Sequence, residues 1–374
     1  MLTAERTQQA SSFLAARRTV LNRMKAAGEG GALDYRPQKI GLSLTDKCNS
    51  NCTYCSASVG PSGKEVMPME IVNRSVREGA DADIAAVVLT GGEPTTHFDL
   101  LMKAIRQASE WALALAIQTN AKMPAETAQK LIKGVGNSGW RQENFGLFQF
   151  NLSYALSRSP AEIESLVNFV RLFGQSRIRG EILIEALHDQ PIPVQEGVDL
   201  LNRQLGDRLV GLKDFFLTGD KKLNMIVNFP LMLGRARVLR EMPLGQMIRE
   251  ACQPLDFSGY RRLEQFDQDV IAVDPFGYVY PSGLYMYMGI YPIGNIRVNT
   301  LTEIIEEANC DPFLIMVSRG RAGQFYDLAK ELFPEFAALA KTCAVPFEVF
   351  ADILEEPVKA LAVLDKAADQ LIND

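Results

Sequence analysis

The sequence predicts an α/β protein built around a partial (β/α)6 TIM-like barrel, with a small C-terminal β-hairpin plus helix extension. Three observations support this fold class. Short apolar segments alternate with helical patterns six times between residues 37 and 243. Segment 85–90 is apolar throughout, as expected for a parallel strand covered on both faces. Beyond residue 243 the alternation ends and a strand–turn–strand pattern follows.

The chain divides into four predicted segments. These are an N-terminal helix within 1–36, the barrel at 37–243, the extension at 244–310 and C-terminal helices at 311–374. Residues 3–25 have helix formers throughout, and a glycine-rich stretch at 28–31 stops them. The predicted strands are 39–45, 85–90, 115–120, 147–153, 178–184 and 223–229. The predicted intervening helices include 97–111, 125–133, 161–173 and 194–205.

Three cysteines, Cys48, Cys52 and Cys55, follow the first predicted strand, although the whole chain has only 6. A structural zinc site needs four protein ligands, and the nearest histidine is His97. Iron–sulfur clusters also take four thiolates, so three would leave one iron open to another ligand. The alternatives are a zinc-stabilised loop, a disulfide with a spare thiol, or buried small apolar residues.

The second predicted strand runs directly into Gly91, Gly92, Glu93 and Pro94. Two glycines let the backbone approach a ligand closely, and a carboxylate can bind an ammonium group. Alone, this motif is equally compatible with a turn that carries a solvated glutamate. It gains meaning from its position, because loops after parallel strands meet at one edge, where ligands bind.

The CxxxCxxC spacing, with Tyr54 before the last cysteine, resembles the cluster loop of the radical S-adenosylmethionine (SAM) superfamily. This resemblance implies one 4Fe-4S cluster held by the three cysteines, with SAM on the fourth iron. It also implies that SAM is cleaved to methionine and a 5′-deoxyadenosyl radical. The residues that it assigns to the cofactor are Tyr54, Gly91, Gly92, Glu93, Pro94, Asn120 at the third strand and Ser153 at the fourth. Ser153 is nearly as compatible with capping a turn.

Segment 269–280 predicts a β-hairpin around Asp274, Pro275, Phe276 and Gly277. Together with Gly294-Asn295-Ile296, it resembles the SPASM or twitch extension of many radical SAM enzymes. Ser282 stands where a full SPASM extension has a cysteine, so no auxiliary cluster is expected. Without one, redox-neutral chemistry becomes more attractive, with a thiol that returns hydrogen to the substrate. The candidate donors are Cys252, which we rank first, Cys310 and Cys343; each is also compatible with a buried structural role.

The composition limits the classes of binding partner that we expect. A net charge of −6 and a pI near 5.3 do not favour a nucleic-acid substrate, which needs clustered basic residues. No stretch is long and apolar enough to span a bilayer, and residues 1–36 lack a signal-peptide pattern. We therefore expect a cytoplasmic protein that binds neither nucleic acid nor membrane. The resemblance adds an electron donor such as flavodoxin or ferredoxin.

The leading function hypothesis is hydrogen abstraction from a peptide, such as the precursor of a ribosomally made product, or from a natural product. Epimerisation, dehydrogenation or cross-linking would follow. The alternatives are an epimerase or dehydrogenase of a carbohydrate-containing small molecule, an RNA-modifying radical SAM enzyme, and a non-catalytic metal-binding protein. The degenerate extension favours a peptide, whereas the short segment 1–36 leaves no room for a leader-binding domain.

Overall fold

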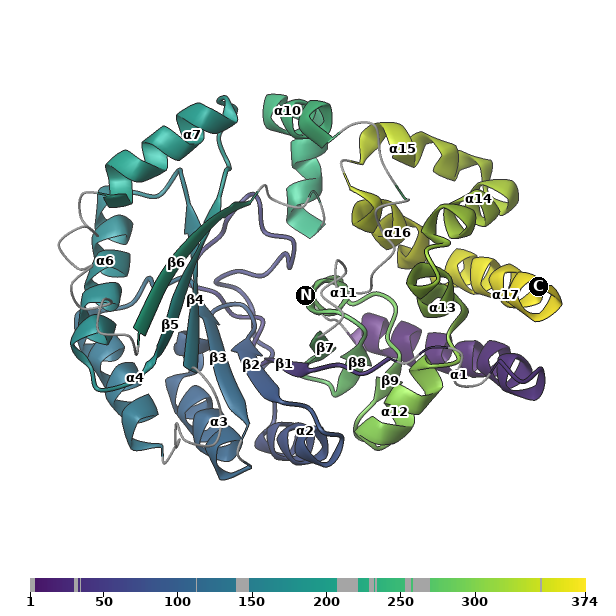
Figure 1. Ribbon diagram of the computed structural model, residues 1–374, viewed down its shortest axis with the longest axis horizontal. Coiled ribbons are helices and arrows are strands. Elements are labelled where there is room, and N and C mark those ends of the chain that lie inside the picture. Colours follow the sequence, from purple (N-terminus) through teal and green to yellow (C-terminus); the bar gives the residue numbers. More distant parts are fainter. Residues whose placement is uncertain are drawn as a thin grey trace.

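The structure is a computed structural model that describes residues 4–29, 33, 35–111, 113–138, 148–206, 221–228, 232, 234–252, 257, 270–343 and 345–374. Its described strands form one sheet in the order β6-β5-β4-β3-β2-β1-β7-β8-β9. The six strands from β1 to β6 are parallel, and each pairs with its neighbour in sequence. This open, curved arrangement confirms the predicted partial barrel (Figure 1).

All six predicted barrel strands are present, with ends shifted by a few residues. They are β1 (Lys39–Ser43), β2 (Ala86–Thr90), β3 (Ala114–Thr119), β4 (Phe148–Ala155), β5 (Gly180–Leu187) and β6 (Lys221–Asn228). The helices between them lie on the outer side of the sheet (Figure 1). They are α2 (Met69–Asp81), α3 (Phe98–Glu110), α4 (Ala125–Asn137), α6 (Pro160–Gln175) and α7 (Val194–Leu201).

Two helices differ from the predicted segments at their ends. The segment predicted at 97–111 begins earlier, as the 3-10 turn η1 (Pro94–His97), because Pro94 suits a first helical turn and Glu93 caps it. The segment predicted at 194–205 ends as an α-helix at Leu201 and continues as the π turn η2 (Asn202–Gly206).

The two faces of β4 and β5 have different environments. Alternate residues such as Phe150 and Ile184 are fully buried, and Phe150 packs edge-on against Phe169 and Phe173 of α6. The residues between them are only half-buried. Because successive side chains point to opposite faces, the half-buried set lines the inside of the barrel. The core therefore lies between sheet and helices, and the inner face is left accessible.

The predicted hairpin is present as β7 (Val270–Val273) and β8 (Tyr278–Tyr280), which pair antiparallel. Its turn is held by Asp274, whose carboxylate accepts from the backbone N–H groups of Phe276 and Tyr278. Strand β7 also pairs with β1 in parallel. The extension therefore continues the barrel sheet at its β1 edge. Helix α11 (Gly283–Met288) and β9 (Gly294–Asn295) follow.

The described part of segment 311–374 is helical. Its elements are α13 (Pro312–Ser318), α14 (Ala322–Leu332), η5 (Pro334–Ala338), α15 (Leu339–Thr342), α16 (Pro346–Glu355) and α17 (Pro357–Asn373). Three further helical elements precede it, which are η3 (Gly234–Glu241), α10 (Pro243–Cys252) and α12 (Leu301–Ala308). The N-terminal helix α1 (Ala4–Ala26) lies beside α17 (Figure 1). It is anchored where Arg17 forms a fully buried ion pair with Asp311 at 2.6 Å.

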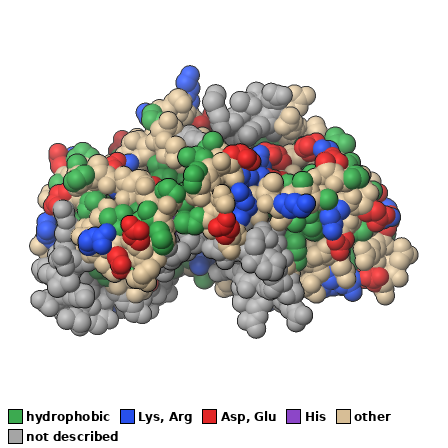
Figure 2. Space-filling view, turned by 90° about the horizontal axis from the view of Figure 1, so that it is seen from above, with side chains coloured by type: hydrophobic (Ala, Val, Ile, Leu, Met, Phe, Trp, Pro, Cys, Tyr) green, Lys and Arg blue, Asp and Glu red, His purple; other side chains and the backbone are tan. Residues whose placement is uncertain are grey.

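The described helices include none with the length and apolarity needed to cross a bilayer. Figure 2 shows basic and acidic side chains interspersed on the face that it presents, with apolar side chains between them. The basic side chains drawn there do not gather into one field of the kind that a nucleic-acid backbone requires.

Candidate active site at the barrel mouth

The three motif cysteines lie in one loop directly after β1, at the carboxyl edge of the sheet. Cys48 is buried, Cys52 and Cys55 are half-buried, and none of the three forms a disulfide. The loop is ordered by its own backbone: Cys48 N–H donates to the carbonyl of Gly60 at 3.0 Å, and Cys55 N–H to that of Cys52 at 3.3 Å. Burial raises the pKa of the Cys48 thiol to about 11, so metal binding here must release a proton.

Within the described residues, no three His, Cys, Asp or Glu side chains are grouped so that they could hold a metal ion. A single ion needs its ligands around one atom, whereas a polynuclear cluster places a different iron at each thiolate and spaces them more widely. The structure therefore places the three thiols in one loop without grouping them around a single-ion position.

Gly91 and Gly92 pack directly against the cysteine loop. A Cβ on Gly91 would lie 2.5 Å from the carbonyl oxygen of Thr45, and one on Gly92 would lie 2.3 Å from that of Lys47. The same backbone forms hydrogen bonds there, from Gly92 N–H to Thr45 at 2.6 Å and from Glu93 N–H to Lys47 at 2.8 Å. Only glycine allows this approach, so the motif after β2 is joined to the loop after β1.

Glu93 is 1% exposed, and its carboxylate accepts hydrogen bonds from protein groups. The donors are the hydroxyl and N–H of Thr95 at 2.6 and 3.1 Å, the hydroxyl of Thr119 at 2.8 Å and the N–H of Asn120 at 2.8 Å. The carboxylate thus caps η1 and joins the ends of β2 and β3. Its predicted contact with an ammonium group stays a prediction.

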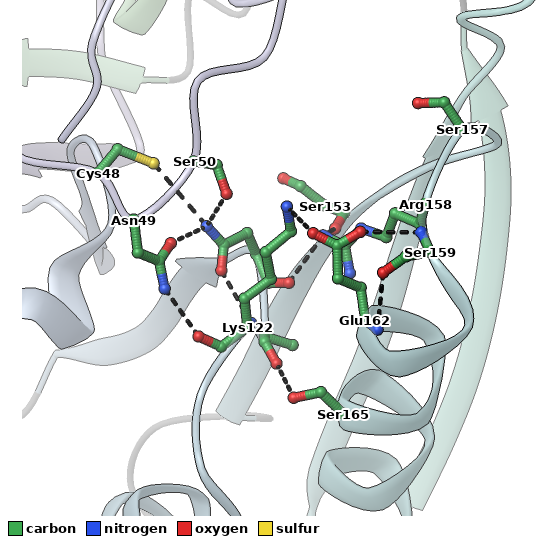
Figure 3. Close-up of polar contacts among 12 residues, drawn as sticks. Cys48, Asn49, Ser50, Lys122, Ser153, Ser157, Arg158, Ser159, Glu162 and Ser165 are labelled. Atoms are coloured by element: carbon green, nitrogen blue, oxygen red, sulfur yellow. Dashed lines mark hydrogen bonds and ion pairs between the residues drawn. The ribbon is translucent and has the colours of Figure 1, made fainter.

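Asn120, at the end of β3, faces the cysteine loop. Its side-chain amide donates to Asn49 at 2.7 Å, and lies 3.4 Å from the Ser50 hydroxyl and 3.8 Å from Cys48 Sγ. Asn49 in turn donates to the carbonyl of Lys122 at 2.7 Å. Figure 3 shows Cys48, Asn49 and Ser50 on one side of this network. The structure therefore brings Asn120 into contact with the cysteine loop, whereas its assignment to the cofactor stays a prediction.

Tyr54 packs against a small apolar cluster from the segment after β6, formed by Met232, Ala236, Leu239, Leu244 and Ile248. Burial, and then the neighbouring Cys52, raise the pKa of the Tyr54 phenol well above its ordinary value. Tyr54 therefore connects the cysteine loop to η3 and α10, which cover it from one side.

Arg158 is a site residue that the sequence analysis missed. It follows β4, is 8% exposed, and uses Nη2 to donate to the carbonyl oxygens of Asn120, at 2.7 Å, and Ser153. Its Nε and Nη1 atoms are buried and have no partner among the described residues. Figure 3 shows Arg158 beside Ser153 at the start of the loop. The available signal was an arginine directly after a barrel strand and before the Ser159 helix cap.

The three other cysteines lie apart from this loop in sequence. Cys252 is the last residue of α10, and its side chain is outside the described structure. Cys310 and Cys343 are buried; the Cys310 thiol donates to the carbonyl of Glu306, and burial raises the pKa of Cys343 to about 12. The prediction that one of them donates hydrogen stays a prediction.

Residues 42–139, which include the cysteine loop and the Gly91–Pro94 motif, match the radical SAM superfamily model. These residues therefore form a radical SAM domain. The probable GTP 3′,8-cyclase of Pyrococcus horikoshii is 37% identical over 90 residues, which cover 24% of this chain and 29% of that protein. The GTP 3′,8-cyclase of Desulforamulus reducens is 29% identical over 114 residues, 29% of this chain and 34% of that protein. The chain thus spans about a third or less of the length of these relatives.

Two solved structures are also similar to this radical SAM chain. Streptococcus suis SuiB has 14% identity and a TM-score of 0.47 over 77% of this chain and 69% of its own. The protein anSMEcpe, with bound AdoMet, has 17% identity and a TM-score of 0.46 over 75% of this chain and 84% of its own.

The cofactors of the superfamily are a 4Fe-4S cluster and SAM, and the residues at the barrel mouth fit both groups. The three thiols of the loop, none of them in a disulfide, are one short of the four that a cluster needs, which leaves a coordination position for SAM. SAM carries a carboxylate at its methionine end. A buried guanidinium with two unpartnered nitrogens is suited to bind such a group by charge-assisted hydrogen bonds.

Proposed function

We propose that this protein reductively cleaves SAM to a 5′-deoxyadenosyl radical and uses it to abstract a hydrogen atom from a peptide or natural-product substrate. The observation that carries the proposal is the junction between the cysteine loop and the Gly91–Pro94 motif, where the two backbones hydrogen-bond to each other. The thiols for a cluster and the Gly91–Pro94 motif therefore share one edge of the barrel.

In this proposal Cys48, Cys52 and Cys55 would hold the cluster. When bound, the cluster and SAM supply the electron and the carbon radical that the reaction needs. The protein orients the first ligand through Asn120, whose amide contacts Cys48, and shields the loop through Tyr54. Both contacts would hold the cysteine loop in position in the metal-free protein.

The SAM methionine end would lie between the glycine motif and Arg158. The free nitrogens of Arg158 would bind its carboxylate, because a buried guanidinium gains most from an anionic partner. Arg158 also holds the carbonyls of Asn120 and Ser153, so it links the ends of β3 and β4. Ser153, on the inner face of β4, would then contact the nucleoside.

The substrate would enter the open side of the barrel. A peptide is supported by the hairpin extension, which lies against β1 and resembles a SPASM or twitch module without its cluster cysteines. Cys252 is the proposed hydrogen donor for an epimerisation, and flavodoxin or ferredoxin the proposed source of electrons. The GTP 3′,8-cyclases act on a nucleotide, and the similarity to them covers only a quarter to under a third of this chain.

The direct test is anaerobic reconstitution with iron and sulfide, followed by incubation with SAM and dithionite. We expect about four irons per chain and the release of 5′-deoxyadenosine. Cys55→Ala should lose both, while Cys310→Ala, which alters a buried thiol outside the loop, should retain them. Normal 5′-deoxyadenosine release by Cys55→Ala, or about one zinc in place of the irons, would refute the proposal.

A peptide substrate is tested with peptides deuterated at their Cα positions. Transfer of deuterium into 5′-deoxyadenosine identifies both the substrate class and the bond attacked. If deuterium is transferred only from carbohydrate or nucleotide substrates, the peptide part of the proposal is wrong and the radical chemistry stands.

A further inference from the structure

The inner wall of the barrel at β4 and β5 is unusually polar. Its inward-facing residues, which we call the β4–β5 wall, are Gln149, Asn151, Ser153, Glu181, Leu183, Glu185 and Leu187. All are half-buried, while the outward residues between them are buried against the helices. A barrel interior that only needed to be filled would have apolar side chains here. The wall is therefore suited to bind a polar ligand.

Strand register fixes the relative positions of these residues. Ser153 pairs with Glu185 at the mouth, and Asn151 pairs with Leu183 one step deeper. Paired residues on parallel strands lie on the same face of the sheet, so Glu185 lies beside Ser153. Ser153 is the residue that we propose contacts the nucleoside of SAM. Asn151 lies diagonally below Glu185, with about 8 Å between their Cα atoms.

Most neighbouring polar groups on the inner face already have partners. Thr90 donates to Gln118 at 2.9 Å, and the Tyr287 hydroxyl of α11 lies 2.5 Å from Thr90 and 3.4 Å from Gln118. At the lower end of β5, Glu181 accepts a hydrogen bond from Asn224 on β6. These groups need no ligand.

Glu185 and Asn151 differ from these neighbours in having acceptor atoms without a partner among the described residues. Asn151 Oδ1 is buried and has no hydrogen-bond partner among the described residues. The Glu185 carboxylate has no hydrogen bond or ion pair within the described part of the chain, and burial alone raises its pKa. An acceptor that is removed from water without gaining a donor is unfavourable, and a charged one more so. The wall thus holds two neighbouring acceptors for which the described part of the chain supplies no donor.

We propose that the β4–β5 wall recognises a cationic group of the substrate, a protonated amine or a guanidinium, through the Glu185 carboxylate and Asn151 Oδ1. Several N–H donors and a positive charge are what these two acceptors lack. For a peptide this is a lysine or arginine side chain, or an N-terminus, close to the hydrogen that is abstracted. The placement of this group beside the reacting carbon rests on the proposed function; the cation site itself does not.

The test uses n-butylguanidinium and n-butylammonium as probes, with n-butanol and n-butyrate as neutral and anionic analogues of similar size. Each is titrated calorimetrically into the reconstituted protein saturated with SAM, so that Arg158 is already occupied. Both cations should bind in the millimolar range, and the analogues should not. Glu185→Gln should weaken cation binding roughly tenfold or more, and Asn151→Ala by a smaller factor.

Glu181→Gln is the matched control, because it makes the same change on the same face of β5 at a carboxylate that already has a partner. It should bind the cations as the wild type does. Equal binding of n-butanol, or unchanged cation binding by Glu185→Gln, would overturn the proposal. A Glu185→Gln variant that loses affinity for SAM instead would assign Glu185 to the cofactor, which also overturns it.

Stability gives a second readout. If Glu185 has no protein partner, Glu185→Gln should fold with an equal or higher melting temperature, because it removes an unpaired charge from a half-buried position. A clear decrease would reveal a partner within the protein and refute the proposal. The titrations are repeated without cluster or SAM. Cation binding that depends on Glu185 would support the cation site even if no 5′-deoxyadenosine forms. A failure of the cation site can therefore be distinguished from a failure of the proposed radical SAM function.

Discussion

The side-chain amide of Asn120 lies 3.8 Å from Sγ of Cys48, so the end of β3 contacts the first cysteine of the loop. This is within the range of an N–H···S hydrogen bond, which is longer than one to oxygen. Hydrogen bonds to ligand sulfur atoms are one of the means by which proteins set the potential of an iron–sulfur cluster.

Removing this contact should lower the reduction potential of the cluster. In Asn120→Ala the sulfur loses a donor that stabilises the more electron-rich reduced state. We expect a decrease of some tens of millivolts, where about 59 mV is a tenfold change in a one-electron equilibrium. Spectroelectrochemical titration measures it. Ser165→Ala, which only loses hydrogen bonds to the carbonyls of Ala121 and Met123, is the control. An unchanged potential in Asn120→Ala would show that the amide does not reach the sulfur.

Arg158→Ala should weaken SAM binding by roughly 10- to 100-fold, the value of a hydrogen bond to a charged group. Arg158→Lys should recover part of the loss, because it restores the charge but not the fork of donors. Calorimetric titration of SAM into the cluster-loaded variants measures both effects. Arg171→Ala alters an exposed arginine of α6 that bonds Asn168, and should bind SAM normally. Wild-type affinity in Arg158→Ala would remove this residue from the site.

Gly92→Ala should displace the cysteine loop, because its Cβ would lie 2.3 Å from the Lys47 carbonyl oxygen. Overpacking of this kind costs about 1 to 3 kcal/mol, and the loop also loses its position for metal binding. We expect a lower melting temperature and fewer irons per chain. Gly283→Ala has no atom within 4 Å of its Cβ and should leave both unchanged. Full iron content in Gly92→Ala would contradict the proposed junction.

The buried ion pair of Arg17 and Asp311 should contribute strongly to the attachment of α1. Asp311 also accepts from the Tyr291 hydroxyl at 2.7 Å and caps α13. Arg17→Met leaves a buried carboxylate without its counter-charge and should reduce the free energy of unfolding by about 3 to 5 kcal/mol. Arg23→Met breaks exposed pairs with Asp365 and Asp369 and should cost about 1 kcal/mol or less. Urea denaturation compares them; equal losses would contradict this ranking.

Stability should fall with rising pH because of Asp274. Burial raises the pKa of its carboxyl to about 7, although hydrogen bonds from Tyr280 and the turn backbone lower it. The folded protein therefore binds a proton that the unfolded chain has released between pH 3.8 and about 7. Across that window the free energy of unfolding should decrease by up to about 1.4 kcal/mol per pH unit, and then level off.

Asp274→Asn should flatten this slope, because the amide does not titrate and its oxygen can still accept the turn N–H groups. Thermal unfolding of the metal-free protein from pH 5 to 8 measures the difference between variant and wild type. Asp327→Asn, at an exposed carboxylate beside Lys330, should retain the wild-type slope. Parallel curves for Asp274→Asn and the wild type would contradict the assignment.

The local pattern of the chain predicted most of the barrel, but not every boundary. Apolar runs predicted β1 and β2, and amphipathic spacing predicted the helices between the strands. Both kinds of pattern depend only on residues that are close in the sequence. The end of α7 was wrong by four residues, because the π turn after Leu201 differs little in side-chain pattern from an α-helix. The pairing of β7 with β1 was also missed, because no local signal states which strand an edge will accept.

The amino-acid sequence alone determined the superfamily motifs, since three cysteines at fixed spacing and two glycines before Glu93 are local features. It did not reveal Arg158 or Glu185, which look like ordinary charged residues of a loop and a strand. Their importance follows from the three-dimensional arrangement, because the cost of a charge depends on burial and on which partners the fold brings near. Arg158 became a candidate when its guanidinium was enclosed with two nitrogens unpartnered, and Glu185 when strand register placed it beside Ser153 without a donor.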